Sequence, residues 1–390
     1  MVKKILKNKF FIIFMSFIII VITARFSPVY SLNDRMIVLA VGIEESSNGY
    51  SVILESNPSK DGEDTKVVKG IGNSVSACIL NIEDNTNKKV SLAQVEILYL
   101  SLNLIKNYGI KYLDSEELKE IPEVAVVVAT DKPSEIIGSK ISDNKLKSFD
   151  IGSAIRENKE KVSVLEVNMK DLGRDYLSFL GTVTIPYVEV DRNNIIKNKE
   201  NLLGANDEVN TTLGKENNEN IKLKIEKGCS FCKGKSIILD KEDYLIYQLL
   251  NEKNNKLSGY ISFPLDTEKT INLWINKITI NKNNNIEKDI FTTEYKVNIS
   301  FYDNESAIVD NSGINSKCKI DNSYKKVVED VLNKMGSNFF NKLKLNKIDV
   351  MHLMDKYNII NETKINNEDN FMGKLSTEVS FSIVNEKIKN

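Results

Sequence analysis

The clearest periodicity lies in the last third of the chain, where apolar and polar residues alternate along three segments. The alternation runs from Ile271 to Ile280 with one slip, then from Tyr295 to Phe301 and from Leu375 to Ile383. A period of two buries one face of a strand and leaves the other in water, so these segments predict an antiparallel sheet. Between the second and third strands, apolar residues recur at helical spacing from Tyr324 to Leu343. This spacing predicts a long amphipathic helix on the apolar face of that sheet.

The first half of the chain alternates predicted strands with predicted helices. An Asn48-Gly49 pair between two β-rich runs predicts a hairpin, because these residues readily adopt positive φ angles. Alternating strands and helices indicate a mixed sheet covered by helices. The predicted elements are strands at 36–43 and 50–55, a helix at 73–84, a strand or helix at 95–104, a strand at 124–128 and a helix at 133–138.

These elements predict an α+β protein with three mixed sheet-and-helix domains in an elongated arrangement. The last domain is expected to be the antiparallel sheet packed against the long helix. A polar stretch at 192–219 has no periodicity and is rich in Asn, Lys and Glu, which is typical of a flexible insertion. The predicted boundaries are 1–31 for an export or anchor segment, 32–180 for the N-terminal domain, 181–268 for a middle domain containing the insertion, and 269–390 for the C-terminal domain.

The N-terminus has the pattern of an export signal. Four Lys residues precede an apolar run from Phe10 to Ala24. Fifteen helical residues span about 22 Å, which is shorter than the roughly 30 Å hydrocarbon core of a bilayer. The run therefore indicates a signal peptide, with cleavage after Ser31, or a short membrane anchor that is retained. The Lys residues place this end in the cytoplasm and the remainder of the chain outside.

Composition excludes several functional classes. The 390 residues carry 53 Lys and Arg against 54 Asp and Glu, so there is no basic surplus for nucleic acid. His352 is the one His, which excludes multi-His metal sites. It lies among apolar residues and is interpreted as part of a packed helix. Neither a phosphate-binding loop nor a hydrolase nucleophile motif occurs, so no catalytic, cofactor or metal residue is predicted.

Three other features of the sequence are candidate sites. Cys229 and Cys232 form a C-x-x-C, which in an exported chain suits a redox pair, a local disulfide or two idle thiols. Trp274 falls on the polar phase of its strand, as a contact surface or as a rim residue packed by a loop. The adjacent carboxylates Glu44-Glu45 and Glu116-Glu117 do not share a face of a helix or strand, which predicts a solvating role.

The segment from Leu32, Asn33 and Asp34 to the apolar run ending Gly42-Ile43-Glu44 resembles the start of the mature Ger(x)C family. These proteins are the C subunits of spore germinant receptors. Further resemblances follow in the family's order, and the match covers nearly the whole chain through loose blocks. These blocks are 70–80, 113–130, 177–190, 243–264, 323–357 and the final strand.

The resemblance implies a role and a location. It implies a non-enzymatic subunit that acts with an A-type and a permease-like B-type membrane subunit in nutrient-triggered germination, on the outer face of the spore inner membrane. Family members are usually lipid-modified on a Cys before the first motif, but Phe26 stands at that position. The remaining alternatives are an exported solute-binding or adhesion module and a thiol-disulfide enzyme built on the C-x-x-C.

Overall fold

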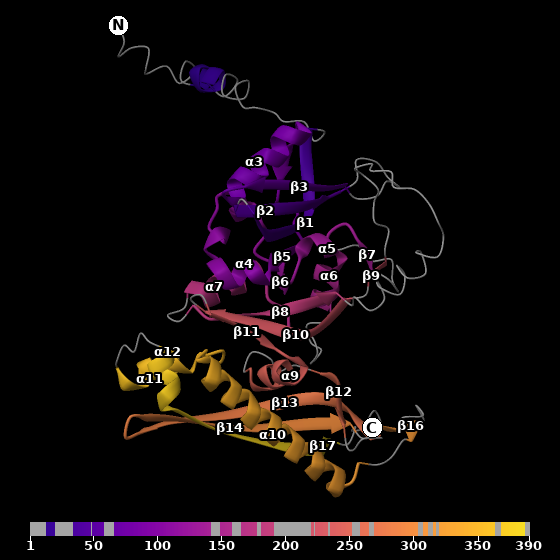
Figure 1. Cartoon of the computed structure of the whole chain (residues 1–390), viewed down its shortest axis with the longest axis vertical. Helices are drawn as coiled ribbons and strands as arrows, with labels where there is room; N and C mark the ends of the chain where they lie inside the picture. Colours follow the sequence, from indigo (N-terminus) through magenta and orange to yellow (C-terminus); the bar gives the residue numbers. More distant parts are fainter. Residues whose placement is uncertain are drawn as a thin grey trace.

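The protein forms two large sheets that lie one above the other along its longest axis (Figure 1). A computed structural model describes residues 13–19, 34–47, 49–57, 66–141, 149–157, 165–177, 181–190, 220–221, 223–232, 235–251, 258–264, 269–302, 307–310, 315–316, 320–362 and 368–386. Helices and strands are mixed in both parts, which confirms the predicted α+β class. The polar stretch at 192–219 lies outside the described residues, as does Cys318.

The first sheet has nine strands and a parallel centre. Strands β1, β5, β6 and β8 run parallel to one another. The pairs β1–β2 and β2–β3 at one side and β8–β10 and β10–β11 at the other are antiparallel. The strands are β1 (Arg35–Ser46), β2 (Gly49–Ser56), β3 (Lys66–Gly72), β4 (Lys89–Ser91), β5 (Ile97–Ser101), β6 (Val126–Thr130), β8 (Val183–Val190), β10 (Leu223–Cys232) and β11 (Lys235–Leu239).

Local chemistry explains the first elements. The predicted hairpin is confirmed, with Ser46 opposite Gly49 and a φ of +121° at Gly49. Helix α3 begins after Ser74, whose hydroxyl accepts a hydrogen bond from the Ala77 N–H. The helix packs closely on β3, because a Cβ at Gly70 would lie 2.2 Å from the Cys78 carbonyl oxygen. The Gly70-Ile71-Gly72 segment therefore serves helix packing.

Helices cover both faces of this sheet. The face formed by Val41, Ile43 and Leu98 packs with α3 (Val75–Thr86), α4 (Leu102–Tyr108) and α7 (Met169–Leu177). The opposite face, with Ala40 and Tyr99, packs with α5 (Pro133–Ile136) and α6 (Asp150–Glu157). Short elements connect these parts: 3-10 turns at Lys111–Leu113 and Glu117–Glu120, and the parallel pair β7 (Lys140–Ile141) and β9 (Asn220–Ile221).

The second sheet contains the alternating segments of the C-terminal region. The slip in the first segment is a register shift between Ile275 and Lys277. The prediction of an antiparallel sheet is wrong in one respect, because β17 runs parallel to β14. Alternation fixes which face is buried but not strand direction, and the helical crossover after β16 allows the parallel pairing. The elements are β12 (Gly259–Pro264), β13 (Lys269–Glu287), β14 (Ile290–Tyr302), β15 (Ala307–Asp310), β16 (Asn315–Ser316), α10 (Asn322–Asn346), α11 (Leu353–Asn361), α12 (Glu368–Lys374) and β17 (Leu375–Glu386).

The long helix α10 covers the inner face of this sheet, as predicted. It lies close to β17, because a Cβ at Gly336 would be 3.1 Å from Val379 Cγ1. Two polar side chains of α10 also reach the backbone of β17. The Phe381 N–H donates to Asn333 Oδ1 and the Ile383 N–H donates to Glu329 Oε1, each at 2.8 Å.

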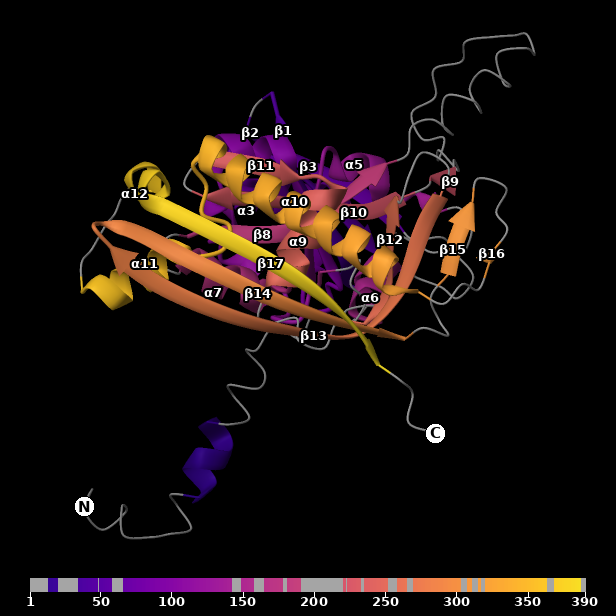
Figure 2. The same cartoon turned by 90° about the horizontal axis from the view of Figure 1, so that it is seen from below.

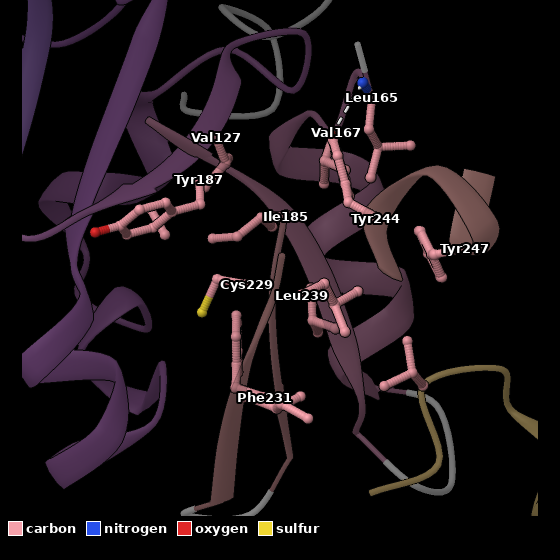
Figure 3. Packing of buried hydrophobic residues seen from close by; sticks show 14 of the residues in the cluster. Val127, Leu165, Val167, Ile185, Tyr187, Cys229, Phe231, Leu239, Tyr244 and Tyr247 are labelled. Atoms are coloured by element: carbon pink, nitrogen blue, oxygen red, sulfur yellow. Dashed lines mark hydrogen bonds between the residues drawn. The ribbon is translucent and has the colours of Figure 1, made fainter. Parts of the chain in front are cut away.

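Helix α9 (Lys241–Leu250) lies between the two sheets (Figure 1). Its tyrosines Tyr244 and Tyr247 pack into the core of the first sheet near Ile185 and Leu239, as Figure 3 shows. The Leu165 N–H donates to the Tyr244 hydroxyl at 3.2 Å. Strands β8, β10 and β11 of the predicted middle domain extend the first sheet, whereas β12 joins the second. The boundaries of a separate middle domain at 181–268 stay a prediction.

Candidate functional site

Gly42 and Glu44, in the second half of β1, form the contact between the first sheet and helix α5. A Cβ at Gly42 would lie 2.6 Å from both Pro133 Cβ and Ile137 Cδ1, so only glycine lets α5 approach here. Two residues later, Glu44 is 9% exposed. Its Oε2 accepts hydrogen bonds from the Ser134 hydroxyl at 2.9 Å and the Ser134 N–H at 3.3 Å. A carboxylate placed against the first turn of a helix accepts a hydrogen bond from a backbone N–H that has no partner within the helix, and this stabilises the start of the helix.

Glu44 also forms an ion pair with Lys69 of β3, with 3.0 Å between Oε1 and Nζ. The neighbouring Glu45 points elsewhere and accepts hydrogen bonds from the Asn107 side-chain amide. The solvating role predicted for Glu44 is therefore wrong. The signal in the sequence is the position of Glu44 directly after the apolar run 36–43, at the end of a predicted buried strand.

The other predicted motif residues are placed only in part. Asp34 directly precedes β1. Leu32, Asn33 and Phe26 lie outside the described residues, so the expectation about the lipidation position stays a prediction.

The C-x-x-C lies inside β10, and neither cysteine is disulfide-bonded in the structure. Residues three apart in a strand point to opposite faces, and Cys229 and Cys232 are both buried thiols. Burial raises the pKa of Cys229 to about 12, so its thiol is protonated at neutral pH. The choice between a local disulfide and two thiols stays a prediction. Figure 3 shows the Cys229 side chain within the apolar cluster of the first sheet.

His352 and Trp274 each contact neighbouring side chains of the fold. His352 has a φ of +52° just before α11, and its Nδ1 lies 3.7 Å from the Asp355 carboxylate. It therefore precedes the helix rather than lying within it. Trp274 packs edge-to-face against Tyr260 on the neighbouring strand, with ring centroids 4.5 Å apart.

A charged cluster joins the two sheets through α9 and α10, which sequence reasoning missed. Lys342 of α10 contacts both Asp240, at 2.9 Å, and Asp243, the most buried of the three. Burial raises the pKa of Asp243 above its usual range, although the Lys342 ammonium opposes this. Burial acts on Asp240 too, but hydrogen bonds from the Asp243 backbone and Lys342 outweigh it and hold the pKa of Asp240 low.

A second ionic contact joins the same two parts. Lys235 of β11 lies 2.5 Å from the Asp369 carboxylate of α12 and 3.4 Å from the Lys347 carbonyl oxygen. These contacts, together with the packing of α9, fix how the C-terminal sheet sits against the first sheet. The inter-sheet joint, defined as Lys235, Asp240, Asp243, Lys342 and Asp369, is thus a structural coupling element.

Within the described ranges, no group of three or more His, Cys, Asp or Glu side chains is placed to hold a metal ion. In the same part of the chain, no helix is long and apolar enough to cross a membrane. The described part of the N-terminal apolar run, residues 13–19, is helical.

Comparison with known proteins gives one family match. Residues 29–190 match the family model described as the spore germination protein N-terminal domain. This match supports the resemblance to the Ger(x)C family over that part of the chain. A search of curated proteins gave no match. Among solved structures, the chain is similar to the crystal structure of the GerBC protein, with a TM-score of 0.48 and 12% identity over 88% of this chain and 97% of that one.

Proposed function

We propose that this protein is a non-enzymatic C-type subunit of a spore germinant receptor. It acts with an A-type and a permease-like B-type membrane subunit in nutrient-triggered germination, on the outer face of the spore inner membrane. The observation that carries the proposal is the family match over residues 29–190, a segment that spans β1 to β8. The proposal therefore rests on the parallel centre of the first sheet and on the helices that cover it.

The side chains support a role in protein contact rather than in chemistry. Glu44 and Lys69 are engaged with each other, and Glu44 also stabilises the start of α5. The Cys229 thiol is buried and protonated, which is the opposite of what a thiol-disulfide enzyme needs. The inter-sheet joint holds the two sheets together through ion pairs. A subunit that contacts one partner through each sheet would need such a connection.

A genetic experiment tests this role. Spores lacking the gene are expected to lose their response to one class of nutrient, measured as dipicolinate release, and to regain it when the wild-type gene is restored. Release by a trigger that bypasses nutrient receptors provides the control and is expected to be unchanged. Normal nutrient responses in the deletion strain to every germinant that the parent strain senses would contradict the proposal.

A biochemical experiment tests location and partners. We expect the protein in the inner-membrane fraction of dormant spores, and we expect a tagged copy to purify with A-type and B-type subunits. Mass spectrometry of the N-terminus distinguishes a retained anchor, with residues 1–31 intact, from cleavage after Ser31. Recovery only from the growth medium of vegetative cells would contradict the proposal and favour a secreted binding module.

A further inference from the structure

Strand β3 forms one edge of the first sheet and carries exposed apolar side chains. In the part of the chain that the structure describes, β3 pairs with β2 alone, over seven residues and without a register shift. Val67 is 42% exposed and Ile71 is 47% exposed, and both point to the same face of the sheet. Figure 1 shows β3 and α3 at the end of the molecule away from the second sheet, and the view from below in Figure 2 shows the second sheet in front of the first. The second sheet therefore does not cover this edge.

The β3 edge has few of the features that keep edge strands from pairing. Such strands are usually protected by Pro, by bulges or by charged side chains at the edge. β3 contains no Pro, and its pairing with β2 has no bulge. Lys69, between Val67 and Ile71, reaches back across the sheet to Glu44 of β1 at 3.0 Å. Its ammonium is engaged within the molecule, while alternate backbone groups of β3 point away from β2 as in any edge strand.

Helix α3 limits what can pair with this edge. A Cβ at Gly72 would lie 2.9 Å from Ala77 Cβ, and a Cβ at Gly70 would lie 2.2 Å from the Cys78 carbonyl oxygen, so α3 lies directly on β3. Antiparallel pairing with β3 of a second copy would place both α3 helices on one face of the joined sheet, above strands about 4.8 Å apart. Helices pack with their axes roughly 8–10 Å apart. A second copy therefore does not fit this pairing, whereas a single extended segment does.

Charge at the β3 edge favours an acidic partner. The seven residues of β3 include two Lys and no acidic residue, and Lys66, at the start of the strand, is exposed. A second copy would bring two more Lys residues to the same place. An acidic side chain opposite Lys66 would instead form a cross-strand pair of opposite charges, which stabilises adjacent strands.

The two faces of the sheet favour different side chains in the added segment. On one face, Val67 and Ile71 offer apolar contacts. On the other face, Asn81 and Asn85 lie four and eight positions after Ala77, on the side of α3 that contacts β3. Both Asn residues are exposed, and Asn85 Nδ2 donates to Asn81 Oδ1 at 3.4 Å. Apolar residues at every second position, with small polar residues between them, match both faces.

We propose that β3 binds an extended segment of a partner protein by strand addition. The segment alternates apolar with small polar residues and carries an acidic residue opposite Lys66. Backbone hydrogen bonds to β3 hold the segment, and its apolar side chains pack against Val67 and Ile71. The inference does not depend on the proposed receptor role.

Selection from a peptide library tests the proposal. Phage that display random decapeptides are selected on the purified full-length protein, and an enriched peptide is then synthesised with a fluorescent label. We expect enriched sequences to alternate apolar and polar residues and to include Asp or Glu. Hydrogen exchange of the β3 amides is expected to slow when the labelled peptide binds, because strand addition gives these N–H groups new acceptors.

Three variants make the test selective. Ile71→Lys places an outward charge on the β3 edge and is expected to weaken peptide binding about tenfold, which corresponds to ~1.4 kcal/mol. Leu80→Lys is the matched control, because Leu80 is 54% exposed and lies four positions after Ser76, which contacts Glu117 on the other side of α3. This variant adds the same charge and is expected to bind normally. Lys66→Gln is expected to weaken binding of an acidic peptide about threefold.

Four outcomes would overturn the proposal. The first is a selection that enriches no peptide, and the second is a peptide that binds Ile71→Lys as tightly as Leu80→Lys when both variants keep the circular dichroism of the wild type. The third is peptide binding that slows hydrogen exchange elsewhere but not in β3. The fourth is self-association of the protein that Ile71→Lys abolishes, which would make a second copy the occupant of this edge.

Discussion

Replacing Gly42 with alanine is expected to destabilise the first sheet and helix α5. The new Cβ would lie 2.6 Å from Pro133 Cβ and from Ile137 Cδ1, closer than packed carbon atoms approach. Overpacking of this kind costs about 1–3 kcal/mol. A shift of α5 also lengthens the Ser134 contacts to Glu44, and loss of a helix-end hydrogen bond costs roughly 0.5–2 kcal/mol. We expect a total loss of about 1.5–5 kcal/mol, with the lower part of the range if α5 moves freely.

Urea unfolding of the full-length protein measures this loss with two probes. Far-ultraviolet circular dichroism reports on both sheets, whereas fluorescence of Trp274 reports on the second sheet. We expect the circular dichroism transition to begin at lower urea in Gly42→Ala. Gly173→Ala is the matched control, because a Cβ there meets nothing within 4 Å and alanine favours helix α7. If Gly42→Ala is as stable as Gly173→Ala, the close approach of α5 to β1 is not a constraint and the reasoning fails.

The remaining predictions concern burial, thiol chemistry and the inter-sheet joint. Val126→Asp buries an unpaired charge in β6 and should unfold the first sheet at a cost of several kcal/mol, whereas Val124→Asp, at an exposed site two residues earlier, should leave circular dichroism and yield unchanged. Because burial raises the pKa of Cys229 to about 12, Cys78, Cys229 and Cys232 should resist Ellman's reagent at pH 8 until urea is added, and rapid labelling of more than one of the four thiols in the native protein would contradict their burial. Lys342→Met leaves a buried carboxylate without its ammonium partner and should cost about 1–3 kcal/mol, with faster hydrogen exchange in α9. Lys334→Met, at an exposed position of the same helix, should exchange like the wild type, and equal exchange in both variants would refute the coupling role.

The sequence predicted those elements whose pattern is local. The β1–β2 hairpin follows from the turn residues at Gly49, and the slip near Ile275 appears as a register shift because one extra residue changes the phase of the alternation. Helix α10 follows from its apolar stripe, although the buried line passes through Val328 and Leu332 and leaves Val327 half-exposed. Each of these features depends on residues within a few positions of each other.

Features that depend on distant residues were not predictable in this way. Period-two patterning carries no strand direction, so the parallel pairing of β17 with β14 was missed. The pattern also does not say which sheet a strand joins, so the joining of β8 and β10 to the first sheet became visible only in the structure. The pairing of Glu44 with Lys69 and the contact between Lys342 and Asp243 join residues separated by 25 and 99 positions.

The contacts between α10 and β17 have a consequence for association between molecules. In the described residues β17 pairs only with β14, so its second side would present unpaired N–H groups to any extended chain nearby. Asn333 and Glu329 occupy two of these donors from within the same molecule. Helix α10 therefore covers the core and also prevents β17 from acting as a template for a foreign strand. With these two donors occupied, the edge of β17 offers a second copy of the protein fewer hydrogen-bond partners for strand addition.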